Sequence, residues 1–193
     1  MNTCMRSAVT SGCRGDDMHT FISGGCKNGK SYYAQRVAKA AGRPLYYVAT
    51  MISTGAEDDA RIARHLKERE GWGFETLECG KGILQCLDGA DADGSFLLDS
   101  VTALLANEMF DPAGFDRDAA LRVADELEEF VRRVRHAVIV SDFLYSDAQP
   151  FDEWTENYRR GLALIDRRLA ACCENVLEVS SGIVICHKGV RPL

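Results

Sequence analysis

The sequence predicts an α/β fold of three layers, in which helices cover both faces of a mostly parallel central sheet. Strand-length segments alternate with helix-length segments along the chain, which is the pattern of folds built on a parallel sheet. Several strand-length segments are apolar throughout, as strands buried on both faces are. A glycine-rich loop also joins the first strand to the first helix, the usual place for a phosphate-binding loop.

The first three elements are bounded by turn residues. Residues 18–23 predict a strand that runs directly into the glycine-rich loop. Residues 30–41 predict a helix that ends at Gly42 and Pro44. The next strand, residues 45–50 (LYYVAT), is aromatic and β-branched, so we expect it to be buried.

The middle of the chain predicts two helices and two strands. Residues 57–70 are rich in charge and indicate an exposed helix, and residues 74–78 (FETLE) alternate as a short strand does. Residues 95–100 (SFLLDS) indicate a buried strand that ends in an acid, and residues 101–109 indicate a helix.

The last third of the chain continues the alternation. Residues 116–135 carry apolar side chains on one side and predict an amphipathic helix. Residues 137–142 (AVIVSD) predict another buried strand that ends in an acid, and residues 152–173 predict a long helix. The stretch VLEVSSGIVICHKG predicts two strands joined at Ser181-Gly182, so we expect an antiparallel edge at the C-terminal end of the sheet.

Length and composition fit one domain. The chain has 193 residues, of which 46% are hydrophobic and 27% are charged, which is enough for one sizeable core. We see no internal repeat and no linker. We expect residues 18–193 to form a single domain and the patternless residues 1–17 to be a disordered extension, so that a chain starting at Met18 keeps its fold and activity.

Charge and hydropathy exclude several classes of protein. The net charge of −6 argues against a nucleic-acid binder, which usually presents a basic face. No apolar run approaches the ~18 residues of a membrane helix, and the N-terminus lacks the apolar core of a signal peptide. We therefore expect a cytoplasmic protein with small-molecule substrates and no membrane span.

The eight cysteines predict neither disulfides nor a zinc site. They are scattered, with no Cys-x-x-Cys pair and no Cys/His cluster of metal spacing. We expect reduced thiols that mostly fill the core.

The glycine-rich loop matches the phosphate-loop pattern G-x-x-x-x-G-K-[ST] in full. Its glycines let the backbone wrap phosphates, and the N–H groups at the start of the helix attract negative charge. Lys30 would reach the β- and γ-phosphates of a nucleoside triphosphate, and Ser31 would bind Mg²⁺. This motif predicts a P-loop NTPase-type fold. The expected nucleotide-binding residues are Gly24, Gly25, Cys26, Lys27, Asn28, Gly29, Lys30 and Ser31.

Magnesium also needs a carboxylate, and two of the predicted strands end in one. Asp99 and Asp142 would lie at the carboxyl edge of the sheet, beside the nucleotide. We expect Asp99 to bind the metal together with Ser31, and Asp142 is a second candidate. The alternative for either acid is a helix N-cap, because both stand at the ends of elements.

Several stretches in one order carry a resemblance to a known family: GGCKNGKS, YVATM, DDARIARH, LLDSVT, and LALIDRRLA before VLEVSSGI. The chain resembles the bifunctional adenosylcobinamide kinase / adenosylcobinamide-phosphate guanylyltransferase family from Met18 to about Lys188. The phosphate loop is common to many families, whereas a VAT strand followed by an Arg-Ile-x-x-His helix is much more specific. The resemblance implies cobalamin biosynthesis, with phosphorylation of adenosylcobinamide and then transfer of GMP from GTP, giving adenosylcobinamide-GDP.

The resemblance also implies roles for individual residues. His65, in the motif Arg61-Ile62-x-x-His65, would attack the α-phosphate of GTP and carry GMP, and Lys30 would serve catalysis. A neutral imidazole is a good nucleophile near neutral pH, and a phosphoramidate is a labile carrier. The substrates would be GTP, or ATP as the phosphate donor, with Mg²⁺, and the protein would be a homo-oligomer, a trimer. Further nucleotide contacts that it implies are Met51, Ile52, Ser53, Glu68, Arg69, Glu70, Gly71, Glu78 and Asp99.

The segment after residue 141 departs from the family pattern. The family has Asn-Glu-Val-Gly there, whereas this chain has SDFLYSD, so that Asp142 replaces Asn and Phe143 replaces Glu. Asp166 likewise stands where the family has Asn. Thr102 and Asn107 either fit a Thr/Asn pattern of the family or serve in capping and packing. Two alternatives stay open: a divergent relative with only one half-reaction, and a regulatory module that binds GTP without turnover.

Overall fold

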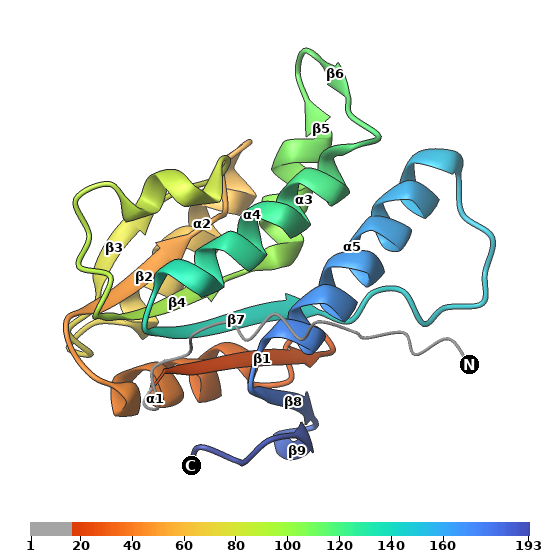
Figure 1. Ribbon diagram of the computed structural model, residues 1–193. Helices are drawn as coiled ribbons and strands as arrows, with labels where there is room; N and C mark the ends of the chain where they lie inside the picture. The colour runs from red at the N-terminus through yellow and green to blue at the C-terminus, as the bar shows by residue number, and fades with distance from the viewer. Residues whose placement is uncertain (1–16) are drawn as a thin grey trace, which may run out of the picture.

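The strand-length segments assemble into one seven-stranded sheet with helices on both sides (Figure 1). The computed structural model describes residues 17–193, so the prediction about residues 1–17 lies outside the described residues except for Asp17. The strands of the main sheet are β1 (Met18–Gly24), β2 (Leu45–Ala49), β3 (Glu75–Glu78), β4 (Ser95–Asp99), β7 (His136–Asp142), β8 (Asn175–Ser180) and β9 (Ile183–Lys188). The helices are α1 (Lys30–Ala41), α2 (Ala56–Glu68), α3 (Val101–Met109), α4 (Ala119–Arg133) and α5 (Glu153–Cys172).

The order of the strands brings three strand ends together. The order is β3-β2-β4-β7-β1-β8-β9, and every neighbouring pair is parallel except β8 and β9, which pair antiparallel. The predicted mostly parallel sheet with an antiparallel C-terminal edge is therefore confirmed. Strand β7 lies between β1 and β4, with Asp142 opposite Gly24 and Val140 opposite Asp99. Asp142 thus ends the strand beside the one that enters the phosphate loop, and Asp99 ends the next strand along the sheet.

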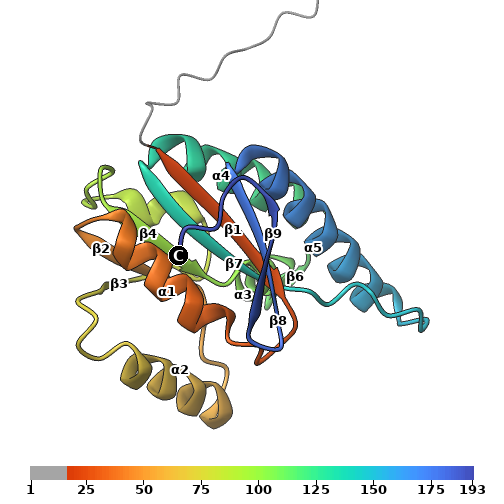
Figure 2. The same ribbon diagram turned by 90° about the horizontal axis from the view of Figure 1, so that it is seen from below.

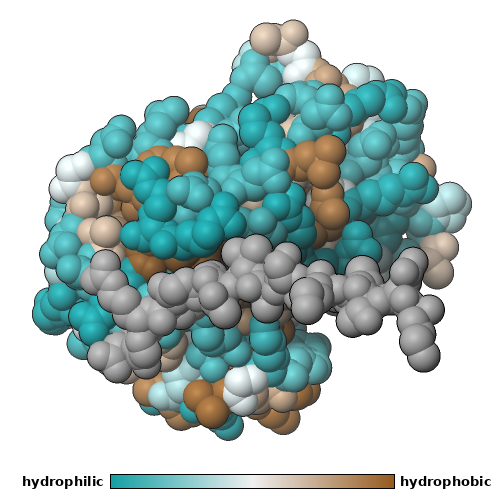
Figure 3. Space-filling view, in the orientation of Figure 1, coloured by the Kyte–Doolittle hydropathy of each residue, from teal (hydrophilic) through white to brown (hydrophobic). Residues whose placement is uncertain are grey.

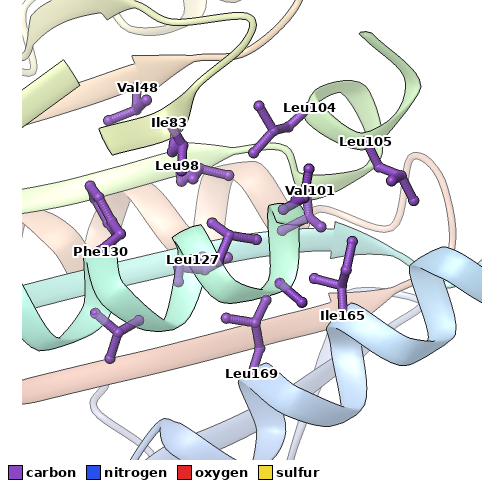
Figure 4. Packing of buried hydrophobic residues seen from close by; sticks show 14 of the residues in the cluster. Val48, Ile83, Leu98, Val101, Leu104, Leu105, Leu127, Phe130, Ile165 and Leu169 are labelled. Carbon is purple, nitrogen blue, oxygen red and sulfur yellow. The ribbon is translucent and has the colours of Figure 1, made fainter. Parts of the chain in front are cut away.

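Two apolar cores hold the helices on the sheet. Helices α3, α4 and α5 cover one face, and α1 covers the other (Figure 1). The first core includes Leu98, Leu127, Phe130 and Ile165, which interlock between the sheet and the helices (Figure 4). Burying each such side chain contributes about 2 kcal/mol. The apolar stripe of α4 faces this core, as its predicted amphipathic pattern requires.

Helix α2 belongs to neither core. None of its residues is buried, and Figure 2 shows it standing apart from the helices that pack on the sheet. The exposed helix predicted for residues 57–70 is thus confirmed with slightly different ends. Because packing on a core supplies most of the stability of a protein helix, α2 depends on its ends for attachment.

Some elements differ from the prediction. The helix expected from residue 116 begins at Ala119, because the Asp116 carboxylate accepts a hydrogen bond from the Asp118 N–H at 2.8 Å and forms a turn. A small hairpin of β5 (Phe110–Asp111) and β6 (Gly114–Phe115) precedes that turn, and a 3₁₀ helix, η1 (Ile83–Leu87), follows β3. Such short elements carry too few residues to show a periodicity.

The surface and the thiols complete the description. Figure 3 shows a face that is largely polar, with apolar patches between the polar side chains. Among residues 17–193, no helix is long and apolar enough to cross a membrane. The six cysteines in this range are free thiols. Cys79, Cys86 and Cys173 are buried, as expected, whereas Cys26 and Cys186 are exposed, which the prediction of core thiols does not cover.

Candidate active site

The phosphate loop needs glycine at both of its ends. Gly24 has a φ of 155°, and a Cβ atom there would lie 2.2 Å from the carbonyl oxygen of Val179 in β8. Gly29 has a φ of 89° and caps the N-terminus of α1. Because glycine has no side chain to fold back on the helix, the first N–H groups of α1 are left for an anion. The loop therefore has the backbone that its motif predicts.

Lys30 is the buried charge beneath this loop. Only 5% of it is exposed, and its Nζ donates hydrogen bonds to the Gly25 carbonyl and to Asp142 Oδ1, both at 2.7 Å. A buried ammonium group is costly without such partners. The pair brings Asp142, from the end of β7, to the place where a bound triphosphate would meet the lysine.

Asp99 lies at the end of β4, and its carboxylate has a fixed partner. Asp99 Oδ2 accepts a hydrogen bond from the Tyr47 hydroxyl at 2.9 Å. Burial, followed by the charge of Asp99, raises the pKa of Tyr47 far above its ordinary value, so the phenol remains a donor. One carboxylate oxygen is thus held by Tyr47, and the other is left for a further ligand.

Neither acid serves as a helix cap. Ser100, the residue after Asp99, is the N-cap of α3 and accepts a hydrogen bond from the Ala103 N–H at 3.4 Å. No helix begins directly after Asp142, whose N–H donates to Thr102 Oγ1 at 2.9 Å. The capping alternative is therefore wrong for both carboxylates.

The oxygen donors at these ends suit Mg²⁺. Ser31 stands in the first turn of α1, next to Lys30, and both acids end neighbouring strands. Within residues 17–193, no group of three or more His, Cys, Asp and Glu side chains could hold a metal unaided. Magnesium usually binds through one or two carboxylates and the phosphates of its substrate. The donor set fits an ion that arrives with a nucleotide.

An open cleft of about 1540 Å³ joins the phosphate loop to α2 and to the ends of β2, β3 and β4. Of the expected site residues, Gly24, Gly25, Glu70 and Gly71 do not line it; the first two shape the loop, and the last two follow α2. The expected residues that do line it are Cys26, Lys27, Asn28, Gly29, Lys30, Ser31, Met51, Ile52, Ser53, His65, Glu68, Arg69, Glu78, Asp99 and Asp142.

His65 lies on the side of the cleft formed by α2. Its Nδ1 is 3.4 Å from Glu68 Oε2, one helical turn later. Among the described residues, none forms a hydrogen bond with its Nε2. This arrangement suits a nucleophile, because a carboxylate beside Nδ1 favours the tautomer with its proton on that nitrogen, which leaves the lone pair on Nε2.

Arg69 attaches the end of α2 to the sheet. Its backbone N–H donates to the His65 carbonyl at 3.2 Å, and its guanidinium carbon lies 3.5 Å from the centroid of the Tyr47 ring. The side chain is buried. Tyr47 was missed as a site residue because it stands inside the apolar strand LYYVAT, where an aromatic residue indicates only core.

Thr102 and Asn107 form hydrogen bonds with the backbone of segments that form the cleft. Thr102 Oγ1 holds the backbone of Asp142, as described above. Asn107 Nδ2 donates to the carbonyls of Thr50 at 2.7 Å and Gly80 at 2.9 Å, and so ties the loops after β2 and β3 together. The structure therefore shows Asn107 joining two loops through hydrogen bonds.

The segment that departs from the family pattern is attached to the start of the phosphate loop and to α5. The Phe143 N–H donates to the Gly24 carbonyl at 2.9 Å, and the Tyr145 hydroxyl donates to Asp166 Oδ2 at 3.0 Å. Arg159 Nη2 donates to the Asp147 carbonyl at 2.7 Å. Burial raises the pKa of Asp166 to about 7, although the hydroxyls of Ser141 and Tyr145 lower it.

Comparison with known proteins identifies a family over most of the chain. A family model described as cobinamide kinase / cobinamide phosphate guanyltransferase matches residues 20–186. The chain is 29% identical over 177 residues to the bifunctional adenosylcobalamin biosynthesis protein CobP of Pseudomonas aeruginosa, covering 89% of this chain and 98% of that one. It is 28% identical over 179 residues to the bifunctional adenosylcobalamin biosynthesis protein CobU of Salmonella typhimurium, covering 86% and 97%.

Solved structures share the fold at low identity. The P4 protein from bacteriophage phi6 in complex with ADP matches with a TM-score of 0.51 and 14% identity, and the match covers 88% of this chain. This chain spans about half, 54%, of that protein. A protein from Pyrococcus horikoshii OT3 matches with a TM-score of 0.51 and 10% identity, over 91% of this chain and 88% of the other. The predicted P-loop NTPase-type fold is confirmed.

Proposed function

The chain belongs to the cobinamide kinase / cobinamide phosphate guanyltransferase family, and on this premise we propose that a single nucleotide cleft serves both reactions. The protein is a transferase of cobalamin biosynthesis that uses nucleotides. In one reaction it phosphorylates the hydroxyl of adenosylcobinamide. In the other it transfers GMP from GTP to adenosylcobinamide phosphate. The observation that carries this proposal is that His65 and the phosphate loop line the same cleft.

The kinase reaction relies on the phosphate loop. Lys30 would exchange its contact with Asp142 for oxygens of the β- and γ-phosphates, where charge builds up during transfer. Ser31 and Asp99 would hold Mg²⁺, with Asp142 as the second candidate. When bound, the ion neutralises charge on the phosphates. The loop N–H groups orient the nucleotide for attack by the substrate hydroxyl.

The transfer reaction relies on His65. Its Nε2 lone pair attacks the α-phosphorus of GTP, so that an N–P bond forms while the P–O bond to pyrophosphate breaks. Glu68, 3.4 Å from Nδ1, stabilises the positive charge that the ring then carries. An oxygen of adenosylcobinamide phosphate next attacks the same phosphorus, the N–P bond breaks, and neutral imidazole returns. The residues proposed to bind the guanosine are Met51, Ile52, Ser53, Glu68, Arg69, Glu70, Gly71 and Glu78.

Separate assays of the two reactions test this division of labour. We expect Lys30→Ala to lower the rates of both reactions at least about a hundredfold, because both need the triphosphate in the loop. We expect His65→Ala to abolish only GMP transfer and to leave phosphorylation of adenosylcobinamide within about twofold. Lys39→Ala, an exposed lysine at the other end of α1, is the control. Loss of phosphorylation in His65→Ala would contradict the proposal.

The SDFLYSD segment favours one alternative, a divergent relative that performs a single half-reaction. Phe143 replaces the glutamate of the family with an exposed apolar side chain beside the phosphate loop. Wild-type protein that performs only one of the two reactions would establish this alternative. Binding of GTP without any turnover would indicate a regulatory module. Assays with ATP and GTP in turn identify the phosphate donor.

The resemblance also supports a homo-oligomer, and we propose a trimer. Light scattering on the eluting protein measures the mass directly against the 21.3 kDa of one chain. A mass of three chains is the expected result, and a monomer at micromolar concentration would contradict it.

A further inference from the structure

Tyr47 touches two groups of the proposed site that come from different parts of the chain. It stands in β2 opposite Leu97 of β4, two positions before the pair of Ala49 and Asp99. Alternate residues of a strand share a face, so the side chains of Tyr47 and Asp99 lie on the same face as diagonal neighbours. The hydroxyl spans this diagonal to Asp99 Oδ2 at 2.9 Å.

The ring of Tyr47 contacts Arg69, the residue that ends α2. The Arg69 guanidinium lies over the ring at 3.5 Å from the centroid, and only 8% of Arg69 is exposed. Within residues 17–193, no carboxylate forms an ion pair with Arg69. A buried guanidinium without a carboxylate gains most from a cation–π contact. Since no residue of α2 itself is buried, this contact is a main attachment of the segment that carries His65.

We propose that Tyr47 is a positioning residue that orients the Asp99 carboxylate for Mg²⁺ and ties it to the segment after α2. The proposal rests on the metal role proposed above for Asp99. A carboxylate free to rotate must be ordered when the metal binds, whereas one held by a donor is already ordered. Partners of this kind typically change metal affinity by about 10–100-fold when removed.

The competing explanation is that Tyr47 only fills the core. It is 3% exposed, and its ring packs edge to face on Phe74 at 6.0 Å between centroids. Replacement by phenylalanine keeps the ring, its contact with Arg69 and its contact with Phe74. Only the hydroxyl is lost, so Tyr47→Phe separates the two explanations.

The matched control is Tyr46→Phe. Tyr46 is the preceding residue, is 6% exposed and belongs to the core on the opposite face. Its hydroxyl accepts a hydrogen bond from the Asp91 N–H at 3.1 Å and does not touch Asp99. The two variants therefore remove one buried hydroxyl each from adjacent residues of the same strand, one bonded to the carboxylate and one not.

The measurement is a Mn²⁺ titration, followed by electron paramagnetic resonance, of full-length protein with a non-hydrolysable GTP analogue. We expect Tyr47→Phe to weaken Mn²⁺ binding at least about tenfold and to leave metal-free nucleotide affinity within about twofold. Tyr46→Phe should leave both unchanged. A lower melting temperature with unchanged Mn²⁺ affinity would show that Tyr47 only fills the core.

Asp99→Asn separates failure of this inference from failure of the proposed function. If Asp99→Asn leaves Mn²⁺ affinity unchanged, the proposed metal role of Asp99 is wrong, and the inference falls with it. If Asp99→Asn weakens Mn²⁺ binding and Tyr47→Phe does not, the inference alone is wrong. In the double variant, the hydroxyl should add less than about twofold, because its target is already altered.

Discussion

Asp166 is the residue with the clearest effect on how the stability of the protein depends on pH. Burial raises its pKa in the folded protein to about 7, whereas an aspartate in an unfolded chain has a pKa of about 3.9. The folded state therefore binds a proton that the unfolded state releases between these two values. Stability from this group is fully present at the acid end of that window and is lost as the pH rises through about 7.

Asp166→Asn should remove this dependence, because an amide stays neutral at every pH. We expect the variant to be more stable than the wild type at pH 8, by up to roughly 4 kcal/mol, and by less than half as much at pH 5. Urea unfolding at the two pH values measures the difference. The exposed Asp118→Asn is the control. A stability difference that is equal at both pH values would refute the assignment to Asp166.

Residue chemistry explains what the sequence could predict of the site and what it missed. Lys30 and Ser31 were predictable because a phosphate loop requires those residue types at fixed spacing. The contact of Lys30 with Asp142 was not predictable, since it depends on β7 pairing with β1, and the two residues are 112 positions apart in the chain. Tyr47 was missed because its strand shows only apolar periodicity, and periodicity does not tell a buried donor from core filler.

A substitution at Gly24 tests whether the phosphate loop depends on its close approach to β8. A methyl group at this position would meet the Val179 carbonyl of the neighbouring strand at 2.2 Å, and the strand cannot move away without breaking its pairing with β1. We expect Gly24→Ala to destabilise the protein by about 3 kcal/mol and to weaken nucleotide binding. Thermal melts and nucleotide titration measure both effects.

Gly55→Ala is the control for that variant. Gly55 has an extended backbone, with a φ of 166°, and a Cβ there would have no heavy atom within 4 Å. Its cost should stay below about 1 kcal/mol. Equal destabilisation by the two substitutions would mean that the close approach at Gly24 does not control the loop.

The segment between β7 and α5 depends on Arg159. Its guanidinium donates to the carbonyls of Leu144 at 3.3 Å and Asp147 at 2.7 Å. We expect Arg159→Ala to speed amide hydrogen exchange over residues 143–150 by at least about tenfold, because charged hydrogen bonds are lost. Arg160→Ala, whose side chain is 81% exposed, should leave exchange unchanged. No difference between the two variants would count against this attachment.

Element boundaries show where prediction from sequence stops. The strands and long helices were predictable because their apolar residues repeat at the spacing of a strand or a helix. The predicted start of α4 was three residues too early, because the Asp116 turn and the β5–β6 hairpin precede the helix. The order of the strands could not be read either, since β7 inserts between β1 and β4 by pairing with residues far away in the chain.

At the scale of the whole molecule, the rigid and the exposed parts have different tasks. The sheet and its two cores fix the phosphate loop and the carboxylates at one edge. Helix α2, which carries His65, contributes no residue to either core. One face of the cleft therefore belongs to the rigid body and the other to a helix attached through Arg69 and Tyr47. This division suits two reactions on one nucleotide, at its γ-phosphate and at its α-phosphate.

The most direct test of this account is incubation of the full chain with GTP labelled in either its α- or its γ-phosphate. We predict that the α label alone becomes attached to the protein, in an adduct that acid removes, since phosphoramidates are labile. His65→Ala should carry no label, and adding adenosylcobinamide phosphate should discharge the wild-type adduct into product. A label that persists in His65→Ala, or an adduct that carries only the γ-phosphate, would contradict the account.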